Sequence, residues 1–379
     1  MIEALELPAW PQPRDVPALS VSQPDLGAAE ALEVHRIMES GWIGSGSPVL
    51  AETEEKLQVI LDSPLVPILV ANGSVALTLA LRALDIGQGH EVVTSNLTYA
   101  ATASSIVHSG ARPVFADVNE ETWQISVEMI SQKITDKTKA IIAPHVYGVT
   151  GDLLKLRAFC DDNNIYLIED CAETFGLKVG GKTVGTFGHI GTFSFFPNKL
   201  LTCGEGGAVV AESHNLSKKL RLLRGQGMDA GRRFYFLEPG FNFRLTALQA
   251  GVLNVQLDRF QELWEARTSV ENSWIKRLGP IATRPKPFDG LSRAPWLFTA
   301  ALKSDHRVVH AIARDLADIG VETRPVFYPL STMPAFEAWP SNTPIANKIS
   351  QSGISLPTHG GVTEQWIDKI SKVIEEKIA

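Results

Sequence analysis

The chain has 379 residues and a formal net charge of −7; 44% of its residues are hydrophobic and 20% are charged. This length exceeds that of a single small domain, so we expect a large core and a second domain. The acidic balance, with no basic run longer than a pair, argues against a nucleic-acid partner. We also expect no membrane partner, because no apolar stretch is long enough to span a bilayer and the first residues do not resemble a signal peptide.

The three cysteines favour a reducing compartment. Cys160, Cys171 and Cys203 form neither a CxxC motif nor an even set of pairs. We therefore expect reduced thiols in a cytoplasmic protein. For Cys171 and Cys203, which flank motifs discussed below, a small buried apolar side chain is the simpler interpretation.

The first part of the chain predicts an arm followed by helices. Residues 1–24 are rich in proline and lack a periodic pattern, so we expect them to lie on the surface. Helical periodicity begins near residue 26 and ends at Gly41, and a second helix is expected over residues 47–61.

Seven short apolar runs follow, with helical segments in several of the gaps. They cover residues 66–72, 91–97, 112–118, 139–148, 165–173, 191–196 and 206–212. This alternation predicts a largely parallel sheet with helices on both faces, and such sheets bind ligands beyond the carboxyl ends of their strands. Five residues of interest follow apolar runs there: Gly73, Tyr99, His145, Asp170 and Ser194.

The last third of the chain predicts a second, smaller α/β unit. A long helix is expected over residues 245–278, as a spine that joins two domains. We divide the chain into an arm (1–24), a large domain (25–262) and a small domain (263–379).

Lys199 is the most informative residue of the sequence. It ends an aromatic, glycine-containing run, and a lysine in such a segment is either at the surface or takes part in chemistry. Ser194 stands five residues before it, and Asp170 ends a predicted buried strand. Together these residues indicate a lysine that forms a Schiff base with pyridoxal phosphate. This role requires an amine whose pKa is lowered by its surroundings.

Two acids accompany this lysine. Asp170 either caps the next helix or pairs with the pyridine nitrogen of the cofactor, which would keep the ring cationic. Glu169 is expected to point to the opposite side of the strand. Glu173 is a candidate to face the phenolic oxygen of the ring.

A phosphate site is predicted where a helix begins. Gly73, Ser74 and Val75 open a helix after the first strand, and its free N–H groups would attract a phosphate, although an ordinary N-cap serine is the alternative. Ser194 offers a second hydroxyl. Tyr99 is a candidate to stack on the ring, and a core aromatic is the other interpretation.

No metal site is predicted. His306 and His310 have helical spacing but no third ligand, which favours a solvated helix face. His145 and His189 are explained at least as well by a structural role.

Five segments in this order resemble the DegT/DnrJ/EryC1/StrS family of sugar aminotransferases, which have the fold type I aminotransferase architecture. The segments are residues 71–84, 96–125, 168–176, 193–210 and 240–258. The resemblance implies a large, mostly parallel seven-stranded domain and a smaller C-terminal α/β domain. It also implies ping-pong transfer from glutamate through a Schiff base on Lys199, with pyridoxamine phosphate as the intermediate cofactor form.

The resemblance also implies roles for individual residues. Lys199 would be the catalytic residue, and the asparagine of the GxNxR segment, Asn242, would reach the phosphate of a neighbouring subunit in a homodimer with shared active sites. The remaining cofactor-binding positions are Gly73, Ser74, Val75, Tyr99, Asp170, Glu173 and Ser194. Family members that dehydrate sugars carry histidine in place of this lysine, so Lys199 argues against that reaction.

Several segments most resemble family members that aminate C4 of GDP-4-keto-6-deoxymannose, a nucleotide-linked sugar. We expect substrate contacts from Arg324, Tyr328 and Ser331, although relatives carry histidine at the last position. Arg232 and Arg233 are further candidates for a diphosphate or a carboxylate, and surface solvation explains each equally well. Two alternatives stay open: the same chemistry on another keto-sugar, or a regulator that binds pyridoxal phosphate without turnover.

Overall fold

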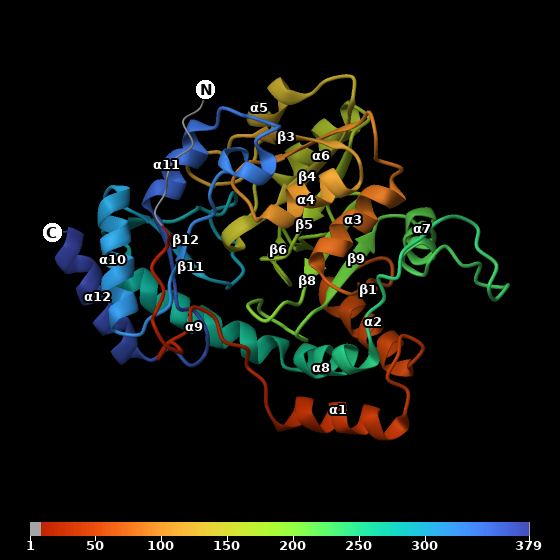
Figure 1. The fold of residues 1–379 in the computed structure, drawn as a ribbon, viewed down its shortest axis with the longest axis horizontal. Helices are drawn as coiled ribbons and strands as arrows, with labels where there is room; N and C mark the ends of the chain where they lie inside the picture. The colour runs from red at the N-terminus through yellow and green to blue at the C-terminus, as the bar shows by residue number, and fades with distance from the viewer. Residues whose placement is uncertain (1–8, 379) are drawn as a thin grey trace.

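The computed structural model describes residues 9–378, and a seven-stranded sheet forms the centre of its larger unit (Figure 1). The strands, in spatial order, are β1 (Ile68–Val70), β9 (Gly207–Ala211), β8 (Ile190–Ser194), β5 (Tyr166–Asp170), β4 (Thr138–Pro144), β2 (Glu91–Ser95) and β3 (Arg112–Ala116). Within this sheet β9 runs antiparallel to both its neighbours, and the other pairs are parallel. The seven predicted strands and the largely parallel sheet are confirmed.

Helices cover both faces of this sheet. One face carries α3 (Gly73–Ala83), α4 (Ala100–His108) and α7 (His214–Arg224), and the other carries α2 (Pro48–Leu61), α6 (Leu153–Asp162) and α8 (Ala247–Asp258). Strand alternation explains the division, because in β5 Ile168 packs with the first group while Leu167 packs with the second. The helix α1 (Ala28–Ser40) lies outside this layer, against α8 (Figure 1).

Short elements connect these layers. They are α5 (Val127–Ile130), the hairpin of β6 (Lys178–Val179) and β7 (Lys182–Thr183), and the 3₁₀ turns η1 (Ser131–Lys133), η2 (Val146–Gly148), η3 (Leu330–Thr332) and η4 (Pro334–Phe336).

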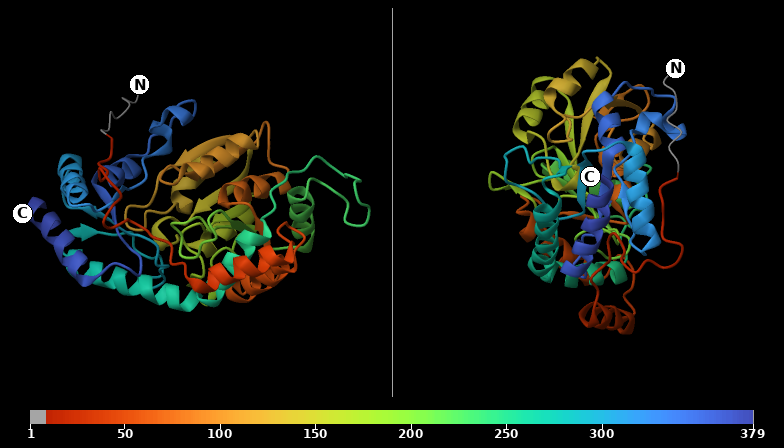
Figure 2. Two further views of the ribbon diagram at one scale, coloured as in Figure 1. Left: turned by 60° about the horizontal axis from the view of Figure 1, so that its bottom comes forward. Right: turned by 90° about the vertical axis from the view of Figure 1, so that its left-hand side faces the viewer.

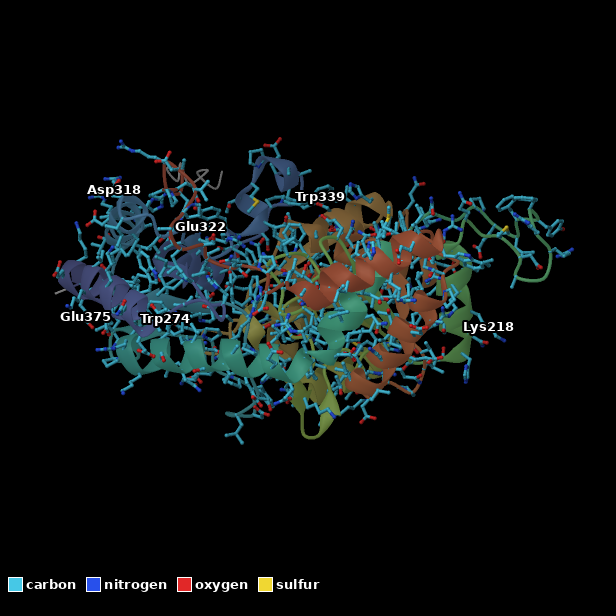
Figure 3. The ribbon with its side chains drawn as sticks, turned by 90° about the horizontal axis from the view of Figure 1, so that it is seen from below. Lys218, Trp274, Asp318, Glu322, Trp339 and Glu375 are labelled. Atoms are coloured by element: carbon cyan, nitrogen blue, oxygen red, sulfur yellow. The ribbon has the colours of Figure 1, made fainter. Side chains whose placement is uncertain are left out.

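The smaller unit is built on an antiparallel sheet. Its spatial order is β10 (Ala282–Thr283), β11 (Phe298–Leu302), β13 (Gly353–Leu356) and β12 (Arg324–Pro325), with helices α10 (His306–Asp318), α11 (Pro344–Ser352) and α12 (Glu364–Ile378). Trp274 is fully buried in its core, near α12, at the end of the molecule where Figure 3 also labels Glu375.

The predicted single helix over residues 245–278 is instead two consecutive helices. α8 ends at Asp258 and α9 (Phe260–Leu278) follows, because Arg259 leaves the helical conformation at φ −92° and ψ 6°. The Arg259 guanidinium binds the carboxylates of Asp25 and Glu30, 2.7 and 3.1 Å away. No glycine or proline marks this break, so the pattern of apolar residues did not predict it.

α9 belongs to the cores of both units. Leu263, in its first turn, packs in the core of the large unit, while Val270 and Trp274 pack in that of the small unit. The predicted boundary between residues 262 and 263 thus falls inside α9. We propose that this helix is shared by the two domains.

The described part of the N-terminal arm lies only partly on the surface. Val16 is exposed, but Leu19 and Val21 are buried. Leu19 pairs with Val321 in a parallel bridge, and the Trp10 Nε1–H donates to the Thr323 carbonyl oxygen at 3.2 Å. The arm is therefore fastened to the small unit.

A second projecting segment, residues 226–240, is here called the aromatic arm. It extends away from the body of the molecule beside α7 (Figures 1 and 2). Four of its consecutive side chains are more than half exposed, namely those of Phe234, Tyr235, Phe236 and Leu237. Such a contiguous exposed apolar group is typical of an interaction site.

Two further expectations concern the whole chain. Among residues 9–378, none of the helices combines the length and hydropathy required to cross a bilayer. The three cysteines are unpaired and buried, and burial raises the pKa of the Cys160 thiol to about 12.

Candidate active site

A cavity of about 540 Å³ opens at the carboxyl ends of the large sheet. Volumes of this order hold small ligands and cofactors. Its lining includes all five strand-end residues named from the sequence, Gly73, Tyr99, His145, Asp170 and Ser194. The topology thus brings together residues that are up to 121 positions apart, as the rule for ligand sites in parallel sheets predicts.

Lys199 reaches this cavity from the loop after β8. Its Nζ lies 4.5 Å from the centroid of the Trp296 ring, and its own carbonyl oxygen accepts from Arg267 at 2.8 Å. Burial lowers the pKa of the Lys199 amine, while Glu173 and Asp170 act in the opposite direction. The neutral amine, which is the nucleophilic form, is therefore easier to reach here than for a lysine in water.

Glu173 is buried beside this amine. Burial raises the pKa of its carboxyl group to about 7, although the Lys199 charge and the Tyr147 N–H oppose the rise. That N–H donates to Glu173 Oε2 at 2.6 Å. Tyr147 adopts a left-handed backbone conformation (φ 57°), which is unusual for a bulky residue and directs its N–H toward the carboxylate.

Asp170 is held by two donors at the end of β5. Its Oδ2 accepts from the Thr102 hydroxyl at 2.8 Å, and its Oδ1 accepts from the Ala172 N–H at 3.2 Å. The side chain of the preceding residue, Glu169, is on the other side of the strand, where it accepts from the N–H groups of Gly185 and Gly188. The predicted opposite orientation of the two acids is thus seen.

The start of α3 and Ser194 form one end of the cavity. A Cβ atom on Gly73 would lie 2.8 Å from Ser194 Cβ, so glycine is required for this close approach. Asn72 caps the helix by accepting from the Val75 N–H at 3.0 Å. The N–H groups of Gly73 and Ser74 are in the first turn, beyond the reach of helical carbonyls. Val75 lies outside the lining, and its N–H is occupied by the cap.

Aromatic side chains form much of the opposite wall. Tyr99 is 63% exposed, and its ring centroid lies 6.1 Å from that of Phe327. Tyr147 is stacked between Phe327 and Trp296, with centroids 5.2 and 6.1 Å away. The alternative of Tyr99 as a core aromatic does not fit this exposure.

The expected substrate residues are dispersed. Arg324 lines the cavity, whereas Tyr328 and Ser331 lie outside the lining. The Ser331 N–H and hydroxyl both bond to the side chain of Asn96, at 2.8 Å each, which joins the small unit to the loop after β2. Asn242 is exposed, and its Oδ1 accepts from Arg244 at 3.0 Å.

The remaining basic and histidine candidates are outside the cavity or have structural contacts. Arg232 lies on the aromatic arm with its guanidinium 3.8 Å from the centroid of Tyr235, and Arg233 is over Phe234. His189 Nδ1 accepts from the Leu167 N–H. The prediction for His310 is wrong, because its ring is buried against Trp10 rather than solvated.

Three buried side chains of kinds that can bind metals lie close together, namely those of His145, Glu169 and Cys171. Glu169 Oε2 lies 3.2 Å from His145 Nε2, and both Glu169 oxygens also accept backbone N–H groups. Burial raises the pKa of the Cys171 thiol. These contacts account for the cluster as part of the folded core.

Several residues of the site were not predicted from the sequence. Thr102 is one turn beyond Tyr99 in α4, so its position on the same helical face was a usable signal. Tyr147, Trp296 and Phe327 gave no signal of their own, because chain segments 149 and 180 residues apart bring their rings together.

Comparisons with known proteins identify the family. Residues 24–375 match the model of the DegT/DnrJ/EryC1/StrS aminotransferase family. The chain belongs to this family. It is 37% identical over 361 residues to the GDP-perosamine synthase of Vibrio cholerae, covering 94% of this chain and 98% of that protein.

Solved structures of aminotransferases share the fold of this chain. The aminotransferase TlmJ from Streptoalloteichus hindustanus superposes with a TM-score of 0.88 at 26% identity, covering 95% of this chain and 98% of that one. The putative sugar aminotransferase Spr1654 from Streptococcus pneumoniae, in its PLP form, superposes with a TM-score of 0.87 at 25% identity. This match covers 95% of this chain and 99% of that one. The protein is an aminotransferase enzyme that uses pyridoxal phosphate, and the expected fold is confirmed.

The residues in the cavity fit this cofactor. An amine, two carboxylates and a helix start next to a serine hydroxyl surround one space of suitable volume. Asn198 also lines the cavity, and its side-chain oxygen is buried without a hydrogen-bond partner among residues 9–378. Such an orphan acceptor is unusual in a finished core and is consistent with a ligand site.

Proposed function

We propose that the enzyme transfers the amino group of glutamate to C4 of a GDP-linked 4-keto-6-deoxy sugar, GDP-4-keto-6-deoxymannose, and so produces GDP-perosamine. The reaction type rests on one observation above all: a lysine whose amine pKa is lowered by burial lines the same cavity as two carboxylates, whose charges act on it. The sugar rests on the likeness to GDP-perosamine synthases over most of the chain.

In this proposal Lys199 binds the cofactor and moves the proton at the reacting carbon. Bound pyridoxal phosphate supplies an electron sink for the negative charge at that carbon. Asp170 would bind the pyridine nitrogen, and the start of α3 with Ser194 would bind the phosphate.

Glu173 acts on the Lys199 amine through its charge. Its pKa of about 7 is near neutrality, where a group that both accepts and donates protons works best. Arg324 would bind a carboxylate or a diphosphate from the cavity wall.

The proposal includes a homodimer with shared active sites. It is supported by the exposed aromatic arm and by Asn242, which follows this arm and is also exposed. A second copy of the chain would cover the apolar side chains and place Asn242 near its phosphate site. A cytoplasmic location is also proposed, supported by the three unpaired, buried cysteines.

A panel of nucleotide-linked keto-sugars tests this function. Purified enzyme with glutamate and pyridoxal phosphate is given GDP-4-keto-6-deoxymannose or its dTDP- and UDP-linked counterparts, and amino-sugar products are measured by mass spectrometry. We expect product from the GDP sugar at the highest kcat/KM. Product from a dTDP or UDP sugar alone would refute the GDP assignment and leave the reaction type standing.

A further inference from the structure

Arg267 has contacts that neither the family match nor the proposed function explains. It projects from α9, is only 5% exposed, and donates to main-chain carbonyl oxygens. Its Nη2 binds the Lys199 oxygen at 2.8 Å, and its Nη1 lies 3.3 Å from the Trp296 oxygen and 3.5 Å from the Asn198 oxygen. One guanidinium therefore joins the lysine loop to the small unit.

The charge of this guanidinium is not neutralised locally. No carboxylate of residues 9–378 forms an ion pair with Arg267, and Asp25 is the acid that acts on it from a distance. Burial lowers the pKa of Arg267 to about 10. Burying a cation without an acid partner is costly, so the arrangement calls for a reason beyond ordinary packing.

The carbonyl group of Asn198 is the centre of this network. Besides Arg267, it accepts from the Trp296 indole N–H at 2.9 Å and from the Ser22 hydroxyl at 3.2 Å. The N-terminal arm, α9 and the start of the small unit thus meet at the residue directly before Lys199.

We propose that Arg267 is the positioning residue for Lys199: its guanidinium fixes the backbone from which the lysine enters the cavity, and its charge disfavours a second cation there. The inference rests on the proposed role of Lys199. Arg267 acts through main-chain oxygens and the electric field, without touching the reacting atoms.

The charges around Lys199 determine how removal of Arg267 should change the pKa of the lysine amine. Glu173 and Asp170 favour the protonated amine, whereas Arg324 and Arg267 disfavour it. Facing Arg267 itself are Asp25 and His359; burial lowers the pKa of His359, and Arg267 adds to this effect. Removing the Arg267 charge therefore leaves the two acids less opposed, and the lysine should hold its proton to higher pH.

The test measures the lysine directly. Reductive methylation of Lys199 is followed by mass spectrometry as a function of pH in cofactor-free full-length protein, alongside kcat of the cofactor-loaded enzyme. Arg267→Gln should shift the methylation midpoint to higher pH, because a cation that disfavours the protonated amine is removed. It should also lower kcat by about 10- to 100-fold, because the lysine backbone is no longer fixed.

Two further variants separate positioning from general stability. Arg267→Lys keeps the charge and loses the planar fork, so the methylation midpoint should return toward the wild-type value while kcat stays low. Arg224→Gln is the control, because Arg224 is a partly buried arginine that binds Glu54 and the Leu69 carbonyl, outside the cavity lining. This control should lower the melting temperature and leave the methylation midpoint unchanged.

A wild-type midpoint and kcat in Arg267→Gln, with only a lower melting temperature as in the control, would overturn the proposal. If Arg267→Gln does not fold, wild-type kcat in Arg267→Lys would overturn it equally. Failure of the proposed function is distinguishable, since the methylation midpoint of Lys199 is measured without any sugar or donor.

Discussion

The floor of the cavity, formed by Asp170 and Glu173, differs from the aromatic arm in how its side chains are covered. On the floor, Asp170 and Glu173 have their oxygens bound by Thr102, Ala172 and Tyr147, so their orientation is fixed within one chain. On the arm, four consecutive apolar side chains are exposed to solvent. The acids of the floor are held by contacts within one chain, whereas the arm leaves an apolar surface uncovered.

This difference assigns the reaction chemistry to the cavity floor and assembly to the aromatic arm. Transferring an amino group requires pKa values shifted by burial, which a closed floor provides. We expect assembly to depend instead on the exposed aromatic arm. Variants of the cavity floor should therefore alter reaction chemistry and leave assembly unchanged, and a floor variant that also changed assembly would contradict the distinction.

Asp170→Asn should have the largest effect among the floor variants. It removes the negative charge proposed to face the pyridine nitrogen while keeping an acceptor for Thr102. We expect kcat to fall by about 10²- to 10³-fold, the usual scale for a preorganised electrostatic contact. Steady-state kinetics measure this, with Asp161→Asn as a control because Asp161 lies at the surface on α6. A loss below threefold would contradict the assigned role.

Glu173→Gln should change the pH dependence more than the rate at the optimum. The Glu173 charge raises the pKa of Lys199, so its removal should move the acidic limb of kcat/KM to lower pH. We expect about tenfold lower kcat/KM at neutral pH, because a proton acceptor beside the amine is lost. An acidic limb at the wild-type position would contradict this coupling.

Glu173→Gln should also change how the stability of the protein depends on pH. The Glu173 pKa is raised from 4.5 to about 7 in the folded state, so between these values the folded state binds more protons than the unfolded state. Its contribution to stability is therefore present at low pH and is lost as pH rises through about 7. Thermal melting of Glu173→Gln should show a weaker decline across this window than the wild type.

Phe236→Asp should alter assembly first. The side chain is 53% exposed on the aromatic arm, and a charge there would oppose burial against a partner. We expect a shift from dimer to monomer in sedimentation velocity, with a matching loss of activity but an unchanged circular dichroism spectrum. Phe288→Asp is the matched control, since Phe288 is also 53% exposed but lies outside the arm. A fully active dimer of Phe236→Asp would refute the role of the arm.

The sequence predicted the parts of this molecule that depend on local pattern. Apolar runs predicted the seven strands of the large sheet, and the rule that ligands bind at strand ends brought together Gly73, Asp170 and Ser194. Lys199 was predicted to be catalytic because lysine is seldom buried and because Ser194 and Asp170 accompany it.

The features that the sequence did not predict depend on contacts between distant segments of the chain. Arg267 meets the Lys199 carbonyl across 68 positions, and Arg259, at the break between α8 and α9, forms ion pairs with Asp25 and Glu30. Ser331 was expected to bind substrate, but in the folded chain its polar atoms are bonded to Asn96. Propensity and periodicity carry no information on such pairs.

The most direct test of the central claim is transfer of nitrogen-15 from labelled glutamate to the sugar by Lys199→Ala. Lys218→Ala, on the exposed surface of α7 (Figure 3), is the matched control. We expect the wild type and Lys218→Ala to produce labelled amino sugar at equal rates, and Lys199→Ala to be slower by about 10³-fold or more. Labelled product from Lys199→Ala at a rate near that of the control would contradict the account.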